Sequence, residues 1–215
     1  MKSFITSLPD SVRNAFKFNQ ASFADLPLFP LGSILFPGGT LALKIFEQRY
    51  LEMAKICLKT DAPFGVALIR EGNEVGIPAV PEMVGTLAYV TAWDMQNLGI
   101  LEVRVTGAGR FKLESHSVSK NGLISGQGSL LPDDPHSECP EYAACAEFLR
   151  KIFTKIDSRE TAIPHRFDDA GWVGYRLTEL LPFNNAVKQK MLELTDARIR
   201  LEILHRYLVD QRLIA

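Results

Sequence analysis

Between residues 25 and 131 the apolar side chains fall in short runs separated by Gly, Pro and Asn. In the clearest run, residues 100–106, the apolar side chains of Leu101, Val103 and Val105 alternate with polar ones. An alternation of period two indicates a β-strand with one buried face. The strands expected on this pattern are residues 41–46, 64–69, 85–93, 100–106 and 110–115.

One helix is expected to interrupt these strands. From residue 47 to residue 58 the apolar side chains recur every three or four positions, which predicts a helix with one buried side. Its apolar stripe would consist of Tyr50, Met53, Ala54, Cys57 and Leu58. The pair Asn121-Gly122 is the best hairpin signal in the chain, because these residues tolerate the positive φ that such turns need. Many short strands with one helix predict a closed or half-closed barrel.

The pattern changes after residue 131. Residues 132–140 are polar and rich in proline, and the apolar spacing beyond them is helical. We therefore expect an N-terminal tail at 1–22 with one short helix, a β-rich domain at 23–131 and a helical bundle at 132–215. The fold class is accordingly α+β. The apolar side of the tail helix would be Val12, Ala15 and Phe16.

Three or four amphipathic helices are expected in the bundle. The first covers about residues 142–156, and the second begins at Asp169, a good N-cap, and stops before a proline. Asn184 can cap the third helix, and either Thr195 or Asp196 can cap the last. The apolar face of the last helix would be Ile199, Leu201, Leu204 and Leu208, with Ile203 and Tyr207 beside it.

Charge and cysteine content narrow the function classes. The chain carries 24 Lys and Arg against 25 Asp and Glu, so it has no basic excess to neutralise a phosphate backbone, and nucleic-acid binding is not expected. Cys57, Cys139 and Cys145 have no Cys-x-x-Cys spacing, which argues against disulfides and zinc and suits a reducing cytoplasm. There is no apolar run of the roughly 20 residues needed to span a membrane, and the N-terminus does not have the pattern of a signal peptide.

The sequence has no pattern that indicates catalysis, a cofactor or a metal. The Gly-Ala-Gly at 107–109 lacks the third glycine of a dinucleotide loop and precedes no helix, so a turn between strands is expected. His136 and Cys139 are the only close pair of metal-ligand types, without the further ligands that a metal needs. The adjacent carboxylates at 133–134 and 168–169 should diverge and act as caps or lie in solvated turns. We predict no enzyme activity, no cofactor and no metal.

Two places offer candidate contact residues for a peptide or a protein partner. Arg49 and Tyr50, at the start of the early helix, could line a recognition groove, since arginine and aromatic side chains are typical interface anchors. Tyr50 also lies on the apolar stripe of that helix, which favours the core over the groove. Trp93 and Met95 lie at the turn between two long strands, where they either form an exposed contact surface or fold against the helical bundle.

Short blocks spread along the chain, taken in order, carry a resemblance to a known family. The blocks are LPLFPL at 26–31, FPG at 36–38, LALKIFEQRY at 41–50, VGTLA at 84–88, VRVTGAGRF at 103–111, LLPF at 180–183, KQKMLELTD at 188–196 and RLEIL at 200–204. Together they resemble the N-terminal substrate-binding domain of Lon proteases, over roughly residues 25–208. The resemblance implies a β-rich pseudobarrel of the PUA-like type followed by a helical bundle.

The resemblance also implies a role in recognising proteins or peptides, in the setting of protein quality control. The Gly-x-x-x-x-Gly-Lys-Ser/Thr phosphate loop of the Lon ATPase module does not occur before the chain ends at Ala215, so neither ATP hydrolysis nor proteolysis carries over. We expect a non-catalytic module that binds unfolded or extended protein segments or a protein partner, and any ATPase or protease that it serves should be a separate chain. The alternatives are an RNA-binding PUA-like protein and, ranked below it, a small-molecule enzyme with its site at the domain interface. The sequence indicates no oligomeric state.

Overall fold

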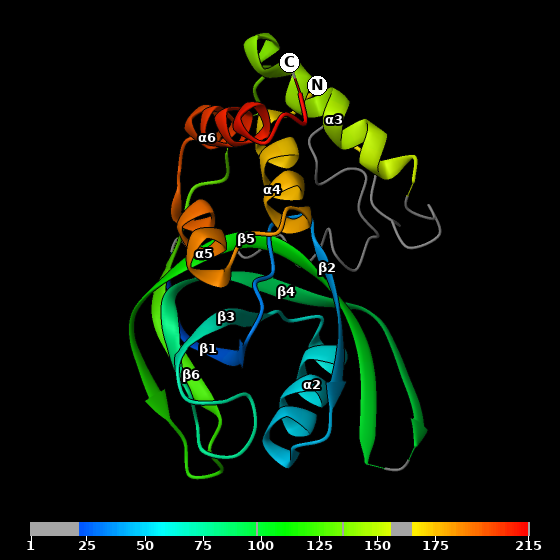
Figure 1. The fold of residues 1–215 in the computed structure, drawn as a ribbon. Coiled ribbons are helices and arrows are strands. Elements are labelled where there is room, and N and C mark those ends of the chain that lie inside the picture. The colour runs from blue at the N-terminus through cyan, green and yellow to red at the C-terminus, as the bar shows by residue number, and fades with distance from the viewer. Residues whose placement is uncertain (1–21, 98, 135, 156–164, 215) are drawn as a thin grey trace. The chain divides into compact units, whose positions relative to one another are not determined.

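The residues that the computed structural model describes are 22–97, 99–134, 136–155 and 165–214 (Figure 1). The helix expected in the N-terminal tail, on Val12, Ala15 and Phe16, falls outside these residues. The chain divides into two compact units, and the division lies between Pro132 and Asp133. Among the described elements, the first unit holds the strands and one helix, and the second holds helices.

The first unit is built on a mixed sheet. Its strands are β1 (Ser22–Leu31), β2 (Thr40–Ile45), β3 (Phe64–Glu71), β4 (Val80–Asn97), β5 (Ile100–Val118) and β6 (Ile124–Leu130). Their order in the sheet is β2-β5-β4-β3-β1-β6, and β6 pairs again with β5. This second pairing closes β5, β4, β3, β1 and β6 into a ring, which confirms the β-rich part of the predicted fold. Among the described strands, β1 and β3 pair in parallel, and the other pairs are antiparallel.

Two strands of the ring, β1 and β6, were not predicted from the alternation of apolar and polar residues. β1 contains two prolines and β6 two glycines, so neither has the run of β-branched and aromatic residues that marks a strand. Both are strands because their backbones pair with neighbours on two sides: β1 with β3 and β6, and β6 with β1 and β5. Pairing that forms only in the folded chain has overridden local propensity.

The turn predicted at Gly107–Gly109 is wrong, because β5 runs through it without interruption. Gly107 exchanges backbone hydrogen bonds with the chain just before β2: it donates to the Gly39 carbonyl and accepts from the Gly38 amide, both at 2.8 Å. A Cβ at residue 107 would lie 2.3 Å from the Phe36 carbonyl oxygen. The glycine therefore serves a close approach of two backbone segments within a continuous strand.

The predicted hairpin at Asn121-Gly122 and the early helix are both confirmed. Gly122 has a φ of 83° and lies in the connection between β5 and β6. The helix α2 spans Gln48–Thr60. The buried residues of its predicted stripe are Tyr50, Met53, Ala54 and Cys57.

The described residues of the first unit form two apolar clusters. One lies where α2 packs against the sheet, and β5 contributes the alternating side chains Leu101, Val103 and Val105 to it. The other includes Phe111 and Leu113 from the second half of β5 together with side chains of β1, β3, β4 and β6. The single strand β5 thus supplies apolar side chains to both clusters.

The described elements of the second unit are short helices. They are the 3-10 helix Pro140–Tyr142 and the α-helices α3 (Ala143–Phe153), α4 (Ala170–Leu180), α5 (Asn185–Glu193) and α6 (Ala197–Asp210). The predicted N-caps are confirmed: the side chains of Asp169, Asn184 and Asp196 accept hydrogen bonds from backbone amides in the first turns of α4, α5 and α6. Of the two candidates before α6, Asp196 is the cap.

The buried face of α6 differs in part from the predicted one. Leu201, Leu204 and Leu208 are buried as expected, but Ile199 and Ile203 are 45% and 43% exposed, and Arg200 is completely buried. Hydrophobic spacing alone would place a charged residue in solvent. Arg200 is buried because the groups around it in the folded unit satisfy its guanidinium.

Arg200 connects several elements of the second unit. It donates to Tyr175 Oη at 3.1 Å and to the carbonyl oxygens of Met191 at 3.1 Å and Leu194 at 2.6 Å. It also pairs with the nearly buried carboxylate of Asp134 at 2.7 Å. Asp134, predicted to be a cap or to lie in a solvated turn, is therefore half of a buried ion pair. The guanidinium carbon of Arg200 lies 3.9 Å from the centre of the Tyr175 ring.

We expect the substitution Arg200→Met to lower the free energy of unfolding by about 3–5 kcal/mol, because it leaves a buried carboxylate without this cation and two carbonyls without this donor. Urea unfolding followed by circular dichroism would measure the loss. Arg198→Met is the matched control. Arg198 pairs with Glu141 at 3.0 Å on the surface, and the change should cost less than about 1 kcal/mol. Equal losses in the two variants would contradict the role given to Arg200.

Candidate functional site

A pocket of about 300 Å³ in the first unit lies along β2. The pocket is lined by five consecutive residues, 42–46, of which the last follows β2. Phe29 and Leu31 of β1, Tyr50 of α2 and the loop residue Val75 also line it. Successive side chains of a strand point to opposite faces, so a pocket that touches five in a row runs along the edge of the strand. We call this pocket the β2 groove.

The apolar side of the β2 groove is formed by packed aromatic rings. The rings of Phe29 and Tyr50 lie 4.3 Å apart between centroids, and the rings of Phe29 and Phe64 lie 6.0 Å apart. Tyr50 is only 4% exposed and belongs to the α2 cluster. Burial raises the pKa of Tyr50 above its usual value, against a smaller opposing effect of Arg49, so its hydroxyl stays protonated at neutral pH.

Arg49 holds the start of α2 in place. Its side chain is almost completely buried, pairs with Glu47 at 2.9 Å and donates to the Gly122 carbonyl at 3.0 Å. Its guanidinium carbon also lies 4.7 Å from the centre of the Tyr50 ring. These contacts tie the beginning of α2 to the β5–β6 hairpin and fix the wall of the β2 groove that Tyr50 forms.

The rim of the β2 groove carries exposed apolar side chains and charges of both signs. Phe46, which follows the last residue of β2, is 53% exposed. Lys44 pairs with Glu102 across the β2–β5 ladder at 3.1 Å, and Glu74 accepts a hydrogen bond from the Gly32 amide at 2.6 Å. Phe46 and Val75 were not singled out from the sequence, because the first reads as the end of a strand and the second as part of a polar loop.

Trp93 and Met95 are not among the residues that line the β2 groove. They are in β4, just before its turn into β5, and their side chains are 61% and 50% exposed. The pairing of β4 with β3 stops at Ala88, opposite Phe64, the first residue of β3. The end of β4 therefore projects as a two-stranded ribbon with β5. The structure brings Tyr50 into the β2 groove, but of the four predicted contact residues only Tyr50 lines it.

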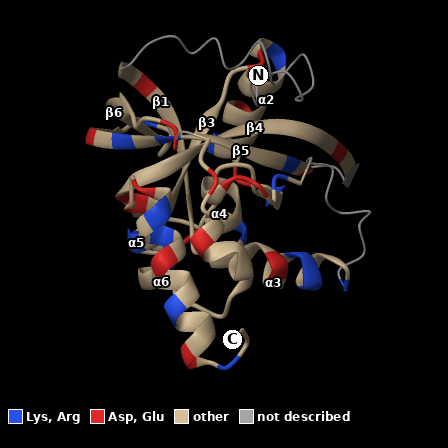
Figure 2. Ribbon diagram, turned by 90° about the horizontal axis from the view of Figure 1, so that it is seen from above, with Lys and Arg blue, Asp and Glu red and all other residues tan. Residues whose placement is uncertain are grey.

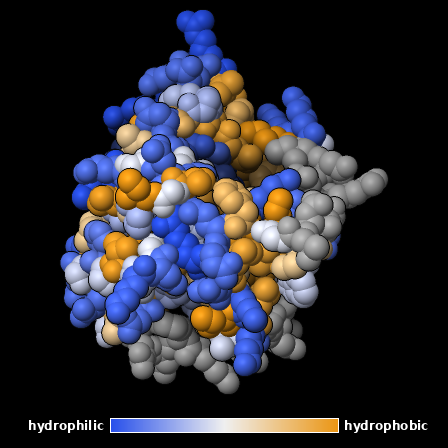
Figure 3. All heavy atoms as spheres, turned by 90° about the horizontal axis from the view of Figure 1, so that it is seen from below, coloured by the Kyte–Doolittle hydropathy of each residue, from blue (hydrophilic) through white to orange (hydrophobic). Residues whose placement is uncertain are grey.

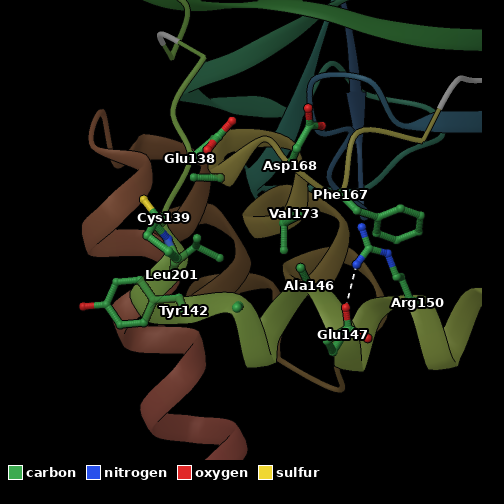
Figure 4. A pocket seen from close by; sticks show the side chains of 13 residues that line it. Glu138, Cys139, Tyr142, Ala146, Glu147, Arg150, Phe167, Asp168, Val173 and Leu201 are labelled. Atoms are coloured by element: carbon green, nitrogen blue, oxygen red, sulfur yellow. Dashed lines mark hydrogen bonds and ion pairs between the residues drawn. The ribbon is translucent and has the colours of Figure 1, made fainter.

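A second pocket of about 300 Å³ lies in the helical unit, between α3, α4 and α6 (Figure 4). Ala146, Val173 and Leu201 give it an apolar floor. At its rim, Arg150 pairs with Glu147 at 2.6 Å and lies over the Phe167 ring at 4.7 Å. The charged groups that line this pocket are thus held in pairs or open to solvent. This arrangement stabilises the helices without presenting an acid–base pair.

The cysteine thiols lack the environment of catalytic nucleophiles. Burial raises the pKa of Cys57 and of Cys145 to about 11. Burial, followed by the nearby Glu141 carboxylate, also raises the pKa of Cys139, which lines the second pocket. A reactive cysteine needs a lowered pKa, and these three environments act in the opposite direction. Within the described residues, no three His, Cys, Asp or Glu side chains converge to hold a metal ion.

The surface carries charges of both signs and both hydrophobic and hydrophilic side chains. Lysine and arginine are interspersed with aspartate and glutamate along the helices and strands (Figure 2). The face drawn in Figure 3 shows hydrophobic side chains in separate clusters with hydrophilic ones between them. Among the described residues, no helix is both long and apolar enough to cross a membrane.

The family model of the ATP-dependent protease La (LON) substrate-binding domain matches residues 25–210. The chain belongs to this family. A crystal structure of a Lon N-terminal domain protein from Xanthomonas campestris shares 36% sequence identity and a TM-score of 0.72, over 85% of this chain and 97% of that one. The N-terminal domain of Lon protease from the Mycobacterium avium complex, at 16% identity and a TM-score of 0.61, shares the fold.

The curated relatives that this chain matches are longer proteins. Lon protease of Xanthomonas oryzae is 25% identical over 86% of this chain and 23% of its own length. Protein cereblon of Danio rerio is 26% identical over 63% of this chain and 31% of its own length. The chain thus spans less than a third of these relatives. The match is to the substrate-binding domain of Lon and does not reach its ATPase or protease modules.

We expect the three thiols to differ in reactivity in the native protein. At pH 8 a thiol with a pKa of about 11 is only roughly one thousandth thiolate, and Cys57 and Cys145 are also buried. Iodoacetamide should therefore label Cys139 first, and mass spectrometry after digestion would locate the label. Rapid labelling of Cys57 or Cys145 without denaturant would contradict the burial of these thiols.

Proposed function

We propose that this chain binds extended segments of unfolded polypeptide without catalysing a reaction on them, and that the β2 groove is where it holds them. The observation that carries the proposal is a pocket with an aromatic wall beside a strand edge in a member of a substrate-binding family. Substrates of such a module share exposed apolar side chains and a free backbone. The β2 groove offers a partner for each of these two features.

The dimensions of the β2 groove suit apolar side chains. A cavity of about 150 Å³ is large enough for a benzene molecule, so 300 Å³ has room for about two side chains of that size. Phe29, Leu31 and Tyr50 are preformed and packed, so binding costs little ordering of the protein. Phe46 at the rim can fold over a bound side chain.

We propose the tip of the β4–β5 hairpin as a second contact. Trp93 and Met95 are two residues apart in a strand and so project from the same face. Large apolar side chains held in solvent at the end of a ribbon favour contact with a partner. Arg49, by contrast, supports the site through its ties to Glu47 and Gly122.

Two alternatives are less well supported. RNA binding needs a basic surface, and the charge of the chain is balanced. Small-molecule catalysis needs a nucleophile or an acid–base pair in a pocket, and the raised cysteine pKa values work against a cysteine nucleophile.

We also propose that the domains are residues 23–131 and 132–215. Free, reduced cysteines favour the cytoplasm as the location.

The substitution Phe46→Ser should weaken binding of an unfolded protein by about tenfold, because an aromatic anchor at a contact surface contributes more than about 1 kcal/mol. Fluorescence anisotropy with fluorescein-labelled, reduced and carboxymethylated lactalbumin would measure the dissociation constant. Val118→Ser is the matched control, since Val118 is also 53% exposed but does not line the β2 groove. No binding by the unaltered protein at high micromolar concentration would contradict the proposed function.

Trp93→Ser should weaken the same interaction by about fivefold, the loss of a partly exposed aromatic contact. The same anisotropy titration measures it, with circular dichroism as a check that the strands remain intact. An unchanged dissociation constant would remove the hairpin tip from the contact surface and leave the β2 groove as the site.

A further inference from the structure

The outer edge of β2 is open in the described structure. β2 stands at one end of the sheet order and pairs only with β5 among the described strands. Backbone groups on that outer edge face away from the sheet, and a strand edge of this kind can accept another strand.

The hydrogen bonds before β2 determine which backbone groups face outward. Gly107 donates to the Gly39 carbonyl, and this bond sets the phase of the antiparallel ladder that follows. In such a ladder, residues that exchange both bonds alternate with residues that exchange none. From the register of β2 with β5, Leu41, Leu43 and Ile45 bond to β5. The N–H and C=O groups of Ala42 and Lys44 therefore point to the outer edge.

The open edge and the apolar pocket occupy the same place. Ala42 and Lys44 are among the residues that line the β2 groove, next to Phe29, Leu31 and Tyr50. A strand laid against β2 would place every second side chain beside Leu43 and Ile45, on the face that belongs to the α2 cluster. The alternate side chains would lie with Lys44 and Glu102, on the face that carries their ion pair.

Building on the proposed function, we propose that the β2 groove binds its substrate by strand addition: an extended segment pairs with the outer edge of β2 and becomes a further strand of the sheet. The segment it takes has apolar side chains at alternate positions, with polar ones between. The backbone supplies affinity for any sequence, and the apolar pocket selects the alternating pattern. The residues at the end of β4 do not line the β2 groove, which is why we place strand addition at β2.

The test uses the full chain and a synthetic seven-residue peptide of alternating threonine and valine with blocked ends. Amide hydrogen exchange by NMR should show that the peptide slows exchange at Ala42 and Lys44 by about tenfold or more, because both amides gain a partner. The amides of Leu41, Leu43 and Ile45 should change little, since they are bonded to β5 in the free protein.

N-methylated peptides test whether the backbone amides of the peptide itself take part in the pairing. In an extended segment, alternate amides point to opposite edges. N-methylation of one alternate set of peptide amides should abolish binding, and N-methylation of the other set should leave it nearly unchanged. Ala42→Pro, which removes one outward N–H, should weaken peptide binding by about tenfold, whereas Ala42→Ser should not.

Strand addition is overturned, with the proposed function intact, if unfolded lactalbumin binds but the exchange at Ala42 and Lys44 stays the same or both methylated peptides bind alike. It is also overturned if Ala42→Pro changes the sedimentation of the protein alone, which would make a second copy the occupant of this edge. If neither the peptide nor unfolded lactalbumin binds, the proposed function fails together with the inference.

Discussion

The architecture of the first unit depends on the pairing of one long strand, β5. Along one edge it pairs with β4 from Ile100 to Lys112. Along the other edge it pairs first with β2 and then, from Phe111 onward, with β6. The pairing with β6 closes the ring, and the pairing with β2 adds a strand that lies outside it. Both apolar clusters of the unit draw side chains from β5, so its position determines where the core and the β2 groove lie.

The same strand explains why β2 stands at the end of the described sheet. A strand inside the ring has neighbours on both sides, whereas β2 pairs with β5 alone among the strands that the structure describes. Closure of a sheet usually removes exposed edges, because an open edge invites pairing with other chains. Here the ring is closed and one short strand remains outside it, next to an aromatic floor. That arrangement is costly for a protein without a partner and useful for one that binds extended chains.

The second unit is held by a different interaction, a buried guanidinium. Arg200 satisfies two carbonyls, a tyrosine hydroxyl and the Asp134 carboxylate in the interior of a helical bundle. A buried ion pair adds little stability compared with an apolar core of the same volume, but it is strongly directional. It therefore fixes how the start of the unit, α4, α5 and α6 fit together. The family resemblance includes this residue only as one letter of a short block, without any sign of its burial.

Local patterns determined the helices, their caps and the strands that alternate: α2 and its stripe, the caps Asp169, Asn184 and Asp196, and the Asn121-Gly122 hairpin follow from interactions within a few residues. Ordered blocks of sequence also determined the family. Only the tertiary structure decided the rest, because it depends on pairing between distant segments. β1 and β6 became strands through their neighbours, Gly107 serves a backbone approach from residue 36, and Arg200 is buried by partners up to 66 positions away. The β2 groove belongs to this second kind, since its floor, wall and edge meet only when β1, β2 and α2 are assembled.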